Sequence, residues 1–264
     1  MSTATPRIAV DAQRLVKRYG AVTAVDGVSF RVDRGEIFGF LGANGAGKTT
    51  TLRMLCGLVS PTSGTVLIDG FDVSTEPMRA KARLGYLDEE PFVHPNLTGR
   101  EFLEYIADLY RMPRGAERQQ RMERLLRIFD LANRDGELIG AYSHGMRQKI
   151  GLASLLIREP SVLLLDEPTN GLDPRSARLV KDLLEELAAR GTTVILSTHI
   201  LEIAQALCRR VAIIDRGHIV ATGTVEDLRA QAGSEQASLE DLFLQLTAGP
   251  ESKAMIEGLL APRP

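Results

Sequence analysis

A glycine-rich stretch, Gly42 to Thr50, carries the clearest chemistry in the sequence, because it fits the pattern G-x-x-x-x-G-K-[ST]. Glycines let consecutive backbone amides point at phosphate oxygens, while the lysine reaches the β and γ phosphates and the hydroxyl binds magnesium. A chance match in a chain of this length is expected in about one sequence in a hundred. The predicted phosphate contacts come from Gly42, Ala43, Asn44, Gly45, Ala46, Gly47, Lys48, Thr49 and Thr50.

Two acidic residues, Asp166 and Glu167, end an apolar run that begins after Ser161. Behind a phosphate-binding loop, we expect Asp166 to hold magnesium, directly or through water. Glu167 is then placed to take a proton from the attacking water. Alone, such a pair at the end of a strand is more often a solvated turn, so the prediction depends on the loop at Gly42.

His199 follows another apolar block, Val194 to Leu196. Parallel strands deliver the residues at their carboxyl ends to one crevice, so we expect His199 to contact the γ-phosphate. An isolated histidine is more often a surface or cap residue. The predicted catalytic residues are therefore Glu167, His199 and Lys48.

A second helix start that could bind an anion lies at Ser143, followed by Gly145. A serine at this position is an ordinary N-cap by default. However, the exposed amides of a helix N-terminus also attract anions. The sequence by itself leaves both interpretations open.

The elements that must position these residues belong to an α/β fold. Four apolar blocks do not alternate with polar residues, which is typical of strands buried on both faces of a parallel sheet. These blocks are Ile37 to Leu41, Val162 to Leu165, Val194 to Leu196 and Val211 to Ile214. A helix that begins at Asp173-Pro174 separates two of them, which predicts βα alternation. An antiparallel β layer is predicted from Ile8 to Leu15, Val22 to Val32 and Val66 to Ile68.

The stretch from Pro91 to Ile157 predicts only helices. Thr98 and Glu101 form a capping box, a second apolar stripe includes Met122 and Phe129, and the third helix starts at Ser143. Near the end of the chain, Ser238 and Asp241 cap another apolar stripe. We expect the residues beyond Ala248 to fray.

Composition excludes several classes of protein. The 264 residues are 44% hydrophobic and 25% charged with a net charge of -2, so binding nucleic acid through bulk positive charge is disfavoured. Cys56 and Cys208 lie alone in apolar stretches, which predicts two reduced packing thiols. No apolar run reaches the length of a membrane span, and the first ten residues lack the apolar block of a signal peptide. We therefore expect a soluble intracellular protein.

Taken together, the motifs resemble the ABC-type ATPase family, in an order that runs from Val10 to about Thr247. The resemblance implies an α/β fold with a P-loop NTPase (RecA-like) parallel-sheet core, the N-terminal antiparallel β layer and an all-helical insertion subdomain. It implies one ATP-binding domain over 8–247. Its parts are the core at 8–90 and 158–225, the helical insertion at 91–157 and a C-terminal helix at about 238–247. We expect 248–264 to be a disordered tail.

The family also implies roles for residues that stand apart from the loop. Tyr19 matches the aromatic residue that stacks on adenine. In the family, two such domains pair head to tail around two ATP molecules, and a signature serine and glycine of one face the phosphate loop of the other. That signature falls on 142–146. We therefore expect Ser143 and Gly145 to contact ATP held by a second copy or a homologous subunit.

Two positions depart from the family pattern. The usual Leu-Ser-Gly-Gly-Gln signature reads Tyr-Ser-His-Gly-Met, and the glutamine expected after Gly85-Tyr86-Leu87 is replaced by Glu89. Because a carboxylate there can bind magnesium, we add Glu89 to Thr49 and Asp166 as predicted metal ligands. Both variants are similar to those in ATPase subunits of bacterial drug, antibiotic or polysaccharide exporters whose permease is a separate polypeptide.

The resemblance implies an ATPase, with ATP and Mg²⁺ as cofactors, that dimerises on ATP to drive export through a separate transmembrane permease. It implies a cytoplasmic protein held at the inner face of the cell membrane by that permease, which we expect to dock near Phe92 and Val93. One alternative is a soluble ABC-type ATPase acting on nucleic acid or the ribosome. We interpret Arg121, Arg124 and Arg127 as a solvated face and expect no nucleic-acid partner. Another alternative, a nucleotide-binding regulator without turnover, is disfavoured because Glu167 and His199 are both present.

Overall fold

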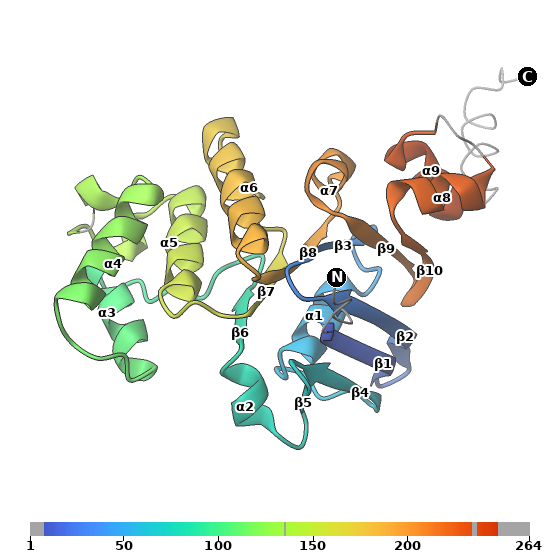
Figure 1. Cartoon of the computed structure of the whole chain (residues 1–264), viewed down its shortest axis with the longest axis horizontal. Helices are drawn as coiled ribbons and strands as arrows, with labels where there is room; N and C mark the ends of the chain where they lie inside the picture. The colour runs from blue at the N-terminus through green and yellow to red at the C-terminus, as the bar shows by residue number, and fades with distance from the viewer. Residues whose placement is uncertain (1–7, 135, 234–236, 248–264) are drawn as a thin grey trace, which may run out of the picture.

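The computed structural model describes residues 8–134, 136–233 and 237–247. Two β-sheets form its centre, and a group of helices extends from one side (Figure 1). The expected C-terminal tail, 248–264, lies outside the described residues. No helix in the described ranges is both long and apolar enough to cross a membrane.

The first sheet is the expected antiparallel β layer. Its strands are β1 (Ile8–Tyr19), β2 (Val22–Asp33), β4 (Ser63–Ile68) and β5 (Phe71–Asp72), in the order β2-β1-β4-β5. Gly20, with a φ of 57°, lies in the tight turn that reverses the chain between β1 and β2. All three strand pairs are antiparallel, which confirms the prediction.

The second sheet has six strands in the order β10-β9-β3-β8-β7-β6. Its strands are β3 (Ile37–Leu41), β6 (Leu84–Leu87), β7 (Val162–Asp166), β8 (Thr193–Thr198), β9 (Arg210–Asp215) and β10 (His218–Gly223). Only β10 pairs antiparallel with its neighbour. All four predicted parallel strands are present.

The helices outside the insertion lie along the chain between and after these strands. They are α1 (Lys48–Leu55), α2 (Pro77–Lys81), α6 (Pro174–Ala189), α7 (Leu201–Leu207), α8 (Val225–Ala232) and α9 (Leu239–Thr247). Asp173 caps α6 by accepting a hydrogen bond from the Ser176 amide, as predicted. Ser238 and Asp241 likewise hydrogen-bond each other at the start of α9.

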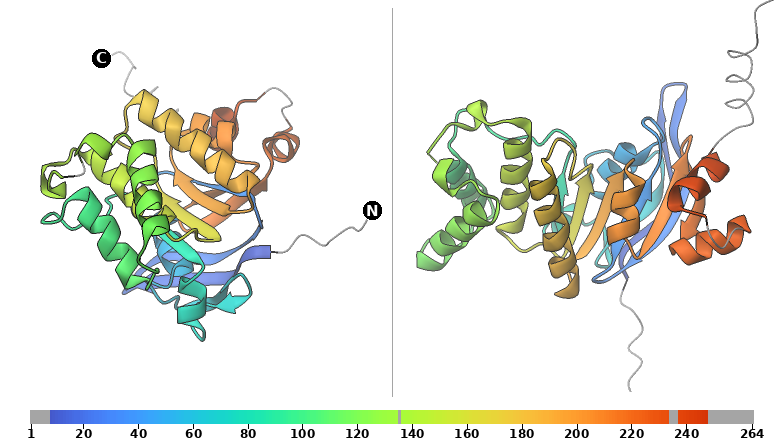
Figure 2. Two further views of the ribbon diagram at one scale, coloured as in Figure 1. Left: turned by 60° about the vertical axis from the view of Figure 1, so that its left-hand side comes forward. Right: turned by 90° about the horizontal axis from the view of Figure 1, so that it is seen from above.

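Residues 91–157 contain α3 (Gly99–Leu109), α4 (Ala116–Ile128) and α5 (His144–Leu156), with short 3-10 helices at Ala132–Arg134 and Ile139–Ala141. These helices gather at one end of the molecule, with α8 and α9 at the other (Figure 2). The predicted capping box of Thr98 and Glu101 is present at the start of α3. This segment is called the helical insertion below.

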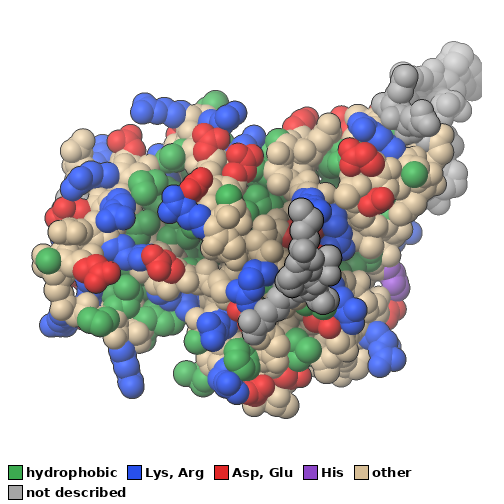
Figure 3. Space-filling view, in the orientation of Figure 1, with side chains coloured by type: hydrophobic (Ala, Val, Ile, Leu, Met, Phe, Trp, Pro, Cys, Tyr) green, Lys and Arg blue, Asp and Glu red, His purple; other side chains and the backbone are tan. Residues whose placement is uncertain are grey.

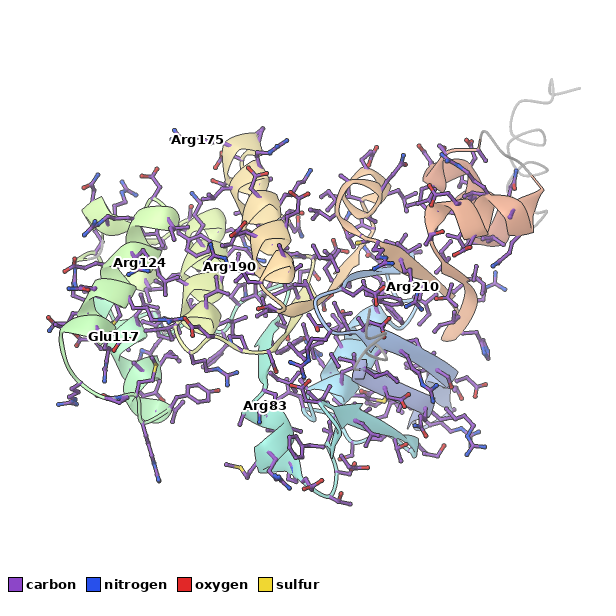
Figure 4. The ribbon with its side chains drawn as sticks, viewed as in Figure 1. Arg83, Glu117, Arg124, Arg175, Arg190 and Arg210 are labelled. Carbon is purple, nitrogen blue, oxygen red and sulfur yellow. The ribbon has the colours of Figure 1, made fainter. Side chains whose placement is uncertain are left out.

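The arginines of α4 only partly fit the predicted solvated face. Arg124 and Arg127 are exposed, and Figure 4 shows Arg124 and Glu117 on this helix. Arg121 is instead half-buried, because it pairs with Glu159 and donates a hydrogen bond to the Leu156 carbonyl at 2.7 Å. On the face of the molecule in Figure 3, basic and acidic side chains are interspersed.

Two apolar cores meet at the parallel sheet. Ile37 and Leu41 of β3 belong to a core shared with the helical insertion, whereas Phe38 and Phe40 belong to a core shared with the β layer. Phe38 stacks on Phe30, with ring centroids 5.5 Å apart. Burial on both faces explains why these strands carry continuous apolar runs. Within the described ranges, both cysteines are free and buried, as predicted.

Candidate nucleotide-binding site

The glycine-rich loop joins the end of β3 to the start of α1, as its pattern predicts. Gly47 is the N-cap of α1 and has a φ of 109°, in the region that favours glycine. A Cβ at this position would lie 2.6 Å from the Ala24 carbonyl oxygen. A Cβ at Gly42 would lie 2.5 Å from the Ile214 carbonyl oxygen. The loop therefore needs glycine at both positions to follow this path.

A pocket of about 220 Å³ opens between this loop and the ends of the parallel strands. Its lining consists of Ala24, Ala43, Asn44, Gly45, Gly47, Lys48, Thr49, Thr50, Glu89, Asp166 and Glu167. The structure thus brings most of the predicted loop residues together with the three predicted carboxylates. These residues come from segments more than a hundred positions apart in the sequence.

Lys48 lies at the bottom of this pocket and is buried. Its Nζ donates hydrogen bonds to the carbonyl oxygens of Gly42 (2.8 Å) and Ala43 (3.3 Å) and lies 3.8 Å from Glu167 Oε1. Burial lowers the pKa of the Lys48 ammonium, while the carboxylates of Glu167, Asp166 and Glu89 act in the opposite direction. The Lys48 ammonium therefore lies where an oxygen of a bound phosphate can replace one of its present carbonyl or carboxylate partners.

Asp166 ends β7 and is almost completely buried. One carboxylate oxygen accepts a hydrogen bond from the Ser197 hydroxyl, whereas the other, Oδ2, is buried without a protein partner. An unpaired buried carboxylate oxygen is costly unless a cation or water satisfies it. This atom therefore fits a magnesium site.

The other predicted metal residues, Thr49 and Glu89, line the same pocket. The described part of the chain has no cluster of three or more His, Cys, Asp or Glu placed to hold a metal by themselves. Magnesium at phosphates commonly takes one or two carboxylates, with phosphate oxygens and waters as the other ligands. The residues present fit such a shared site and not an all-protein metal cage.

Glu167 follows Asp166 and has a backbone φ of 48°, in the left-handed region. Its Oε2 accepts a hydrogen bond from the Thr198 hydroxyl at 3.1 Å, and its Oε1 lies 2.8 Å from His199 Nδ1. An ionised Glu167 can only accept in this contact, so it pairs with the His199 tautomer whose Nδ1 carries the proton. Glu167 is buried and bonded through both oxygens, so its orientation is fixed.

The remaining predicted residues lie outside this pocket. Tyr19 ends β1 with its side chain half-exposed, and the Lys17 ammonium lies 5.0 Å from its ring centroid. Ser143 and Gly145 lie at the start of α5 in the helical insertion, where Ser143 Oγ accepts from the Met146 amide. Gly42 and Ala46 shape the loop without lining the pocket.

Sequence reasoning missed the side chains that orient the acids, namely Ser197 and Thr198 of β8. The strand register places them beside the acids, because Ser197 of β8 pairs with Asp166 of β7 and Thr198 is the last residue of β8. The signal was present in the Ser-Thr-His run, since the hydroxyl residues directly precede His199. The hydrogen bond between Asn170 and Glu89 was also missed.

Comparisons with known proteins give a consistent answer. The family described as "ABC transporter" matches residues 25–170. The daunorubicin resistance ATP-binding protein DrrA3 of Streptomyces coeruleorubidus is 42% identical over 221 residues, covering 83% of this chain and 69% of the relative. The ABC transporter ATP-binding protein NatA of Bacillus subtilis is 38% identical over 224 residues, covering 84% of this chain and 91% of the relative.

Solved structures agree with the described fold. An ATP-binding subunit of an ABC transporter superposes with a TM-score of 0.85 at 34% identity, covering 90% of this chain and 99% of the other. The dimeric ATP-binding cassette MJ0796, in a post-hydrolysis state with ADP and Pi, gives a TM-score of 0.76 at 25% identity. The match covers 82% of this chain and 98% of the other. The expected α/β fold and family resemblance are confirmed. The chain belongs to the ABC transporter family and is an ATPase of that family.

Proposed function

We propose that this chain is the ATP-hydrolysing subunit of an exporter. It dimerises with a second subunit around ATP and thereby drives a separate membrane permease. The observation that supports hydrolysis most directly is the Glu167 carboxylate. It lies in the phosphate-loop pocket 3.8 Å from Lys48 Nζ, held by Thr198 and His199. A fixed base beside a phosphate site is what attack by water requires.

The proposal gives each residue of the site a defined role. The loop amides and Lys48 bind the β and γ phosphates, and Glu167 takes the proton of the attacking water. His199 holds Glu167 in place and contacts the γ-phosphate. Thr49, Asp166 and Glu89 would hold magnesium, which, when bound, neutralises charge on the phosphates.

A second subunit gives Ser143 and Gly145 a role. They lie at the N-terminus of α5, outside the phosphate-loop pocket of their own chain. We propose that they face the ATP held by the other subunit, where the helix N-terminus complements phosphate charge. The solved cassette MJ0796, which is dimeric in a post-hydrolysis state, supports the pairing of two subunits. The adenine would stack on Tyr19, whose half-exposed ring is accessible at the end of β1.

The permease is proposed to dock on the first residues of the helical insertion, before α3, and so hold the ATPase at the cytoplasmic face of the membrane. Phe92 is 95% exposed, the largest fraction among the exposed large apolar side chains of the described residues. Val93, which the sequence suggested as an exposed neighbour, instead packs partly against the core. Phe92 is therefore the more exposed of the two apolar side chains proposed to meet the permease.

The names of several relatives, which refer to drug resistance or to export, support a role in an exporter. They include daunorubicin and linearmycin resistance ATP-binding proteins from Streptomyces and Bacillus.

The arginines of α4 give little support to the alternative of nucleic-acid binding. Arg121 is bonded to Glu159 and Leu156, and Arg118 is buried with bonds to Asp108 and the Glu104 carbonyl.

The proposal is tested with Glu167→Gln, which keeps the side-chain shape but removes the basic carboxylate. We expect ATP binding to survive, turnover to fall about 10²- to 10⁴-fold, and an ATP-dependent dimer to persist in light scattering. Glu185→Gln, an exposed change on α6, is the matched control and should leave both properties unchanged. Near-normal turnover in Glu167→Gln would contradict its assignment as the base.

A further inference from the structure

The geometry points to Asn170 as a positioning residue that sets the Glu89 carboxylate for magnesium and connects it to the turn that carries Glu167. Asn170 Nδ2 donates a hydrogen bond to Glu89 Oε1 at 3.1 Å, although the residues are 81 positions apart. Asn170 is half-buried, whereas Glu89 is exposed and lines the phosphate-loop pocket. The inference rests on the ATP site proposed above.

The segment that carries Glu89 is also fixed on its other side. Arg53, near the end of α1, pairs with Asp88 at 2.9 Å, and the Glu89 amide donates to Asp88 Oδ1 at 3.0 Å. Because α1 begins at Lys48, within the phosphate-loop motif, the ion pair with Arg53 holds Asp88 against the helix that carries Lys48. Glu89 therefore has its backbone held by this anchor and its side chain held by Asn170.

Asn170 belongs to the same turn as the proposed base. Its backbone amide donates to the Glu167 carbonyl at 3.0 Å. The side-chain bond to Glu89 therefore joins two loops, one that enters the helical insertion and one that carries Glu167. A shift of the Glu89 side chain would therefore also shift the turn that positions Glu167.

The chemistry of the contact suits a metal-positioning role. An amide nitrogen is a neutral donor, so it orients the Glu89 carboxylate without cancelling its negative charge. It uses only one of the two oxygens, which leaves the other for magnesium or a magnesium-bound water. Carboxylates that bind metals are themselves commonly hydrogen-bonded, and the loss of such partners weakens metal affinity.

The test is magnesium-dependent binding of a fluorescent, non-hydrolysable ATP analogue to the full chain, titrated upward from EDTA. We expect Asn170→Ala to raise the magnesium concentration at half-maximal effect about 3- to 10-fold. This shift is smaller than the loss of metal affinity that follows when a ligand of an all-protein site loses its hydrogen-bond partner, because phosphates supply some of the ligands here. Affinity in EDTA should stay unchanged. Asn133→Ala, an exposed change in the 3-10 helix Ala132–Arg134, is the control and should match the wild type.

A double-variant cycle identifies the route of the effect. If Asn170 acts through Glu89, then Asn170→Ala should change nothing further in a Glu89→Ala background. An unchanged magnesium midpoint in Asn170→Ala, a shift that persists without Glu89, or a loss of affinity in EDTA would each overturn the inference. A wild type that binds no analogue at any magnesium concentration would instead contradict the ATP site itself.

Discussion

Replacement of Thr198 by valine should slow hydrolysis while leaving nucleotide binding intact. The Thr198 hydroxyl donates to Glu167 Oε2 at 3.1 Å and accepts from the Ile200 amide at 3.0 Å. Thr198 is 1% exposed and Glu167 4%, so water cannot easily replace the lost bond. Valine keeps the branched shape and removes only the hydroxyl.

The magnitude follows from the strength of this bond. A hydrogen bond to a charged group contributes about 1.5–3 kcal/mol. If that orientation is needed only when water attacks, kcat should fall about 10- to 100-fold, since each 1.4 kcal/mol is a factor of ten. KM should change little, because Thr198 is not among the residues that line the pocket.

The assay is steady-state ATP hydrolysis, with kcat and KM determined separately and folding checked by thermal unfolding. Thr198→Ser is the matched control, because it keeps the hydroxyl and should retain most of the wild-type kcat. If folded Thr198→Val hydrolyses ATP at the wild-type rate, the hydroxyl does not orient the base. An equal loss in Thr198→Ser would trace the defect to packing instead.

Four further outcomes are expected. Lys48→Ala should abolish binding of a fluorescent ATP analogue, because the ammonium that offsets phosphate charge is lost; unchanged affinity would exclude the loop as the phosphate site. Gly47→Ala should lower the thermal midpoint by about 3–10 °C through strain and a backbone clash, and more than Gly45→Ala, whose Cβ would meet no atom within 4 Å. Phe92→Asp should release the protein from permease-containing membranes without reducing soluble ATPase activity; retention would argue against docking there. Burial raises the pKa of the Cys208 thiol to about 12, so thiolate is scarce near pH 8 and iodoacetamide should modify it only after unfolding.

Local patterns were sufficient to predict much of the fold. The cap at Asp173 and the capping box of Thr98 and Glu101 depend only on residues within one helical turn, so the sequence displays them directly. The four-residue strand β6 was not predicted, because Leu84–Leu87 is short and contains a glycine. The limits of the subdomains remain predictions.

Contacts between distant segments were harder to predict. Arg121 looks solvated from its helical spacing, but its partner Glu159 lies 38 residues later, and only the packing of α4 against the end of α5 brings them together. The same holds for Thr198 beside Glu167, which depends on the register of two strands. The motif predicts which groups are needed, whereas tertiary structure decides what orients them.

The left-handed backbone of Glu167 has an evolutionary consequence. Its φ of 48° lies in the left-handed region. There, a residue other than glycine costs roughly 1–2 kcal/mol of folding free energy. Glycine or asparagine would adopt the same conformation with less strain, but neither could act as a base. Either replacement would also leave the buried Thr198 hydroxyl and the buried Lys48 ammonium without the Glu167 carboxylate as a partner, and this loss offsets the relief of strain. Duplicated copies freed from transport would therefore be expected to lose Glu167 together with changes at Thr198 or Lys48, and not by a single substitution.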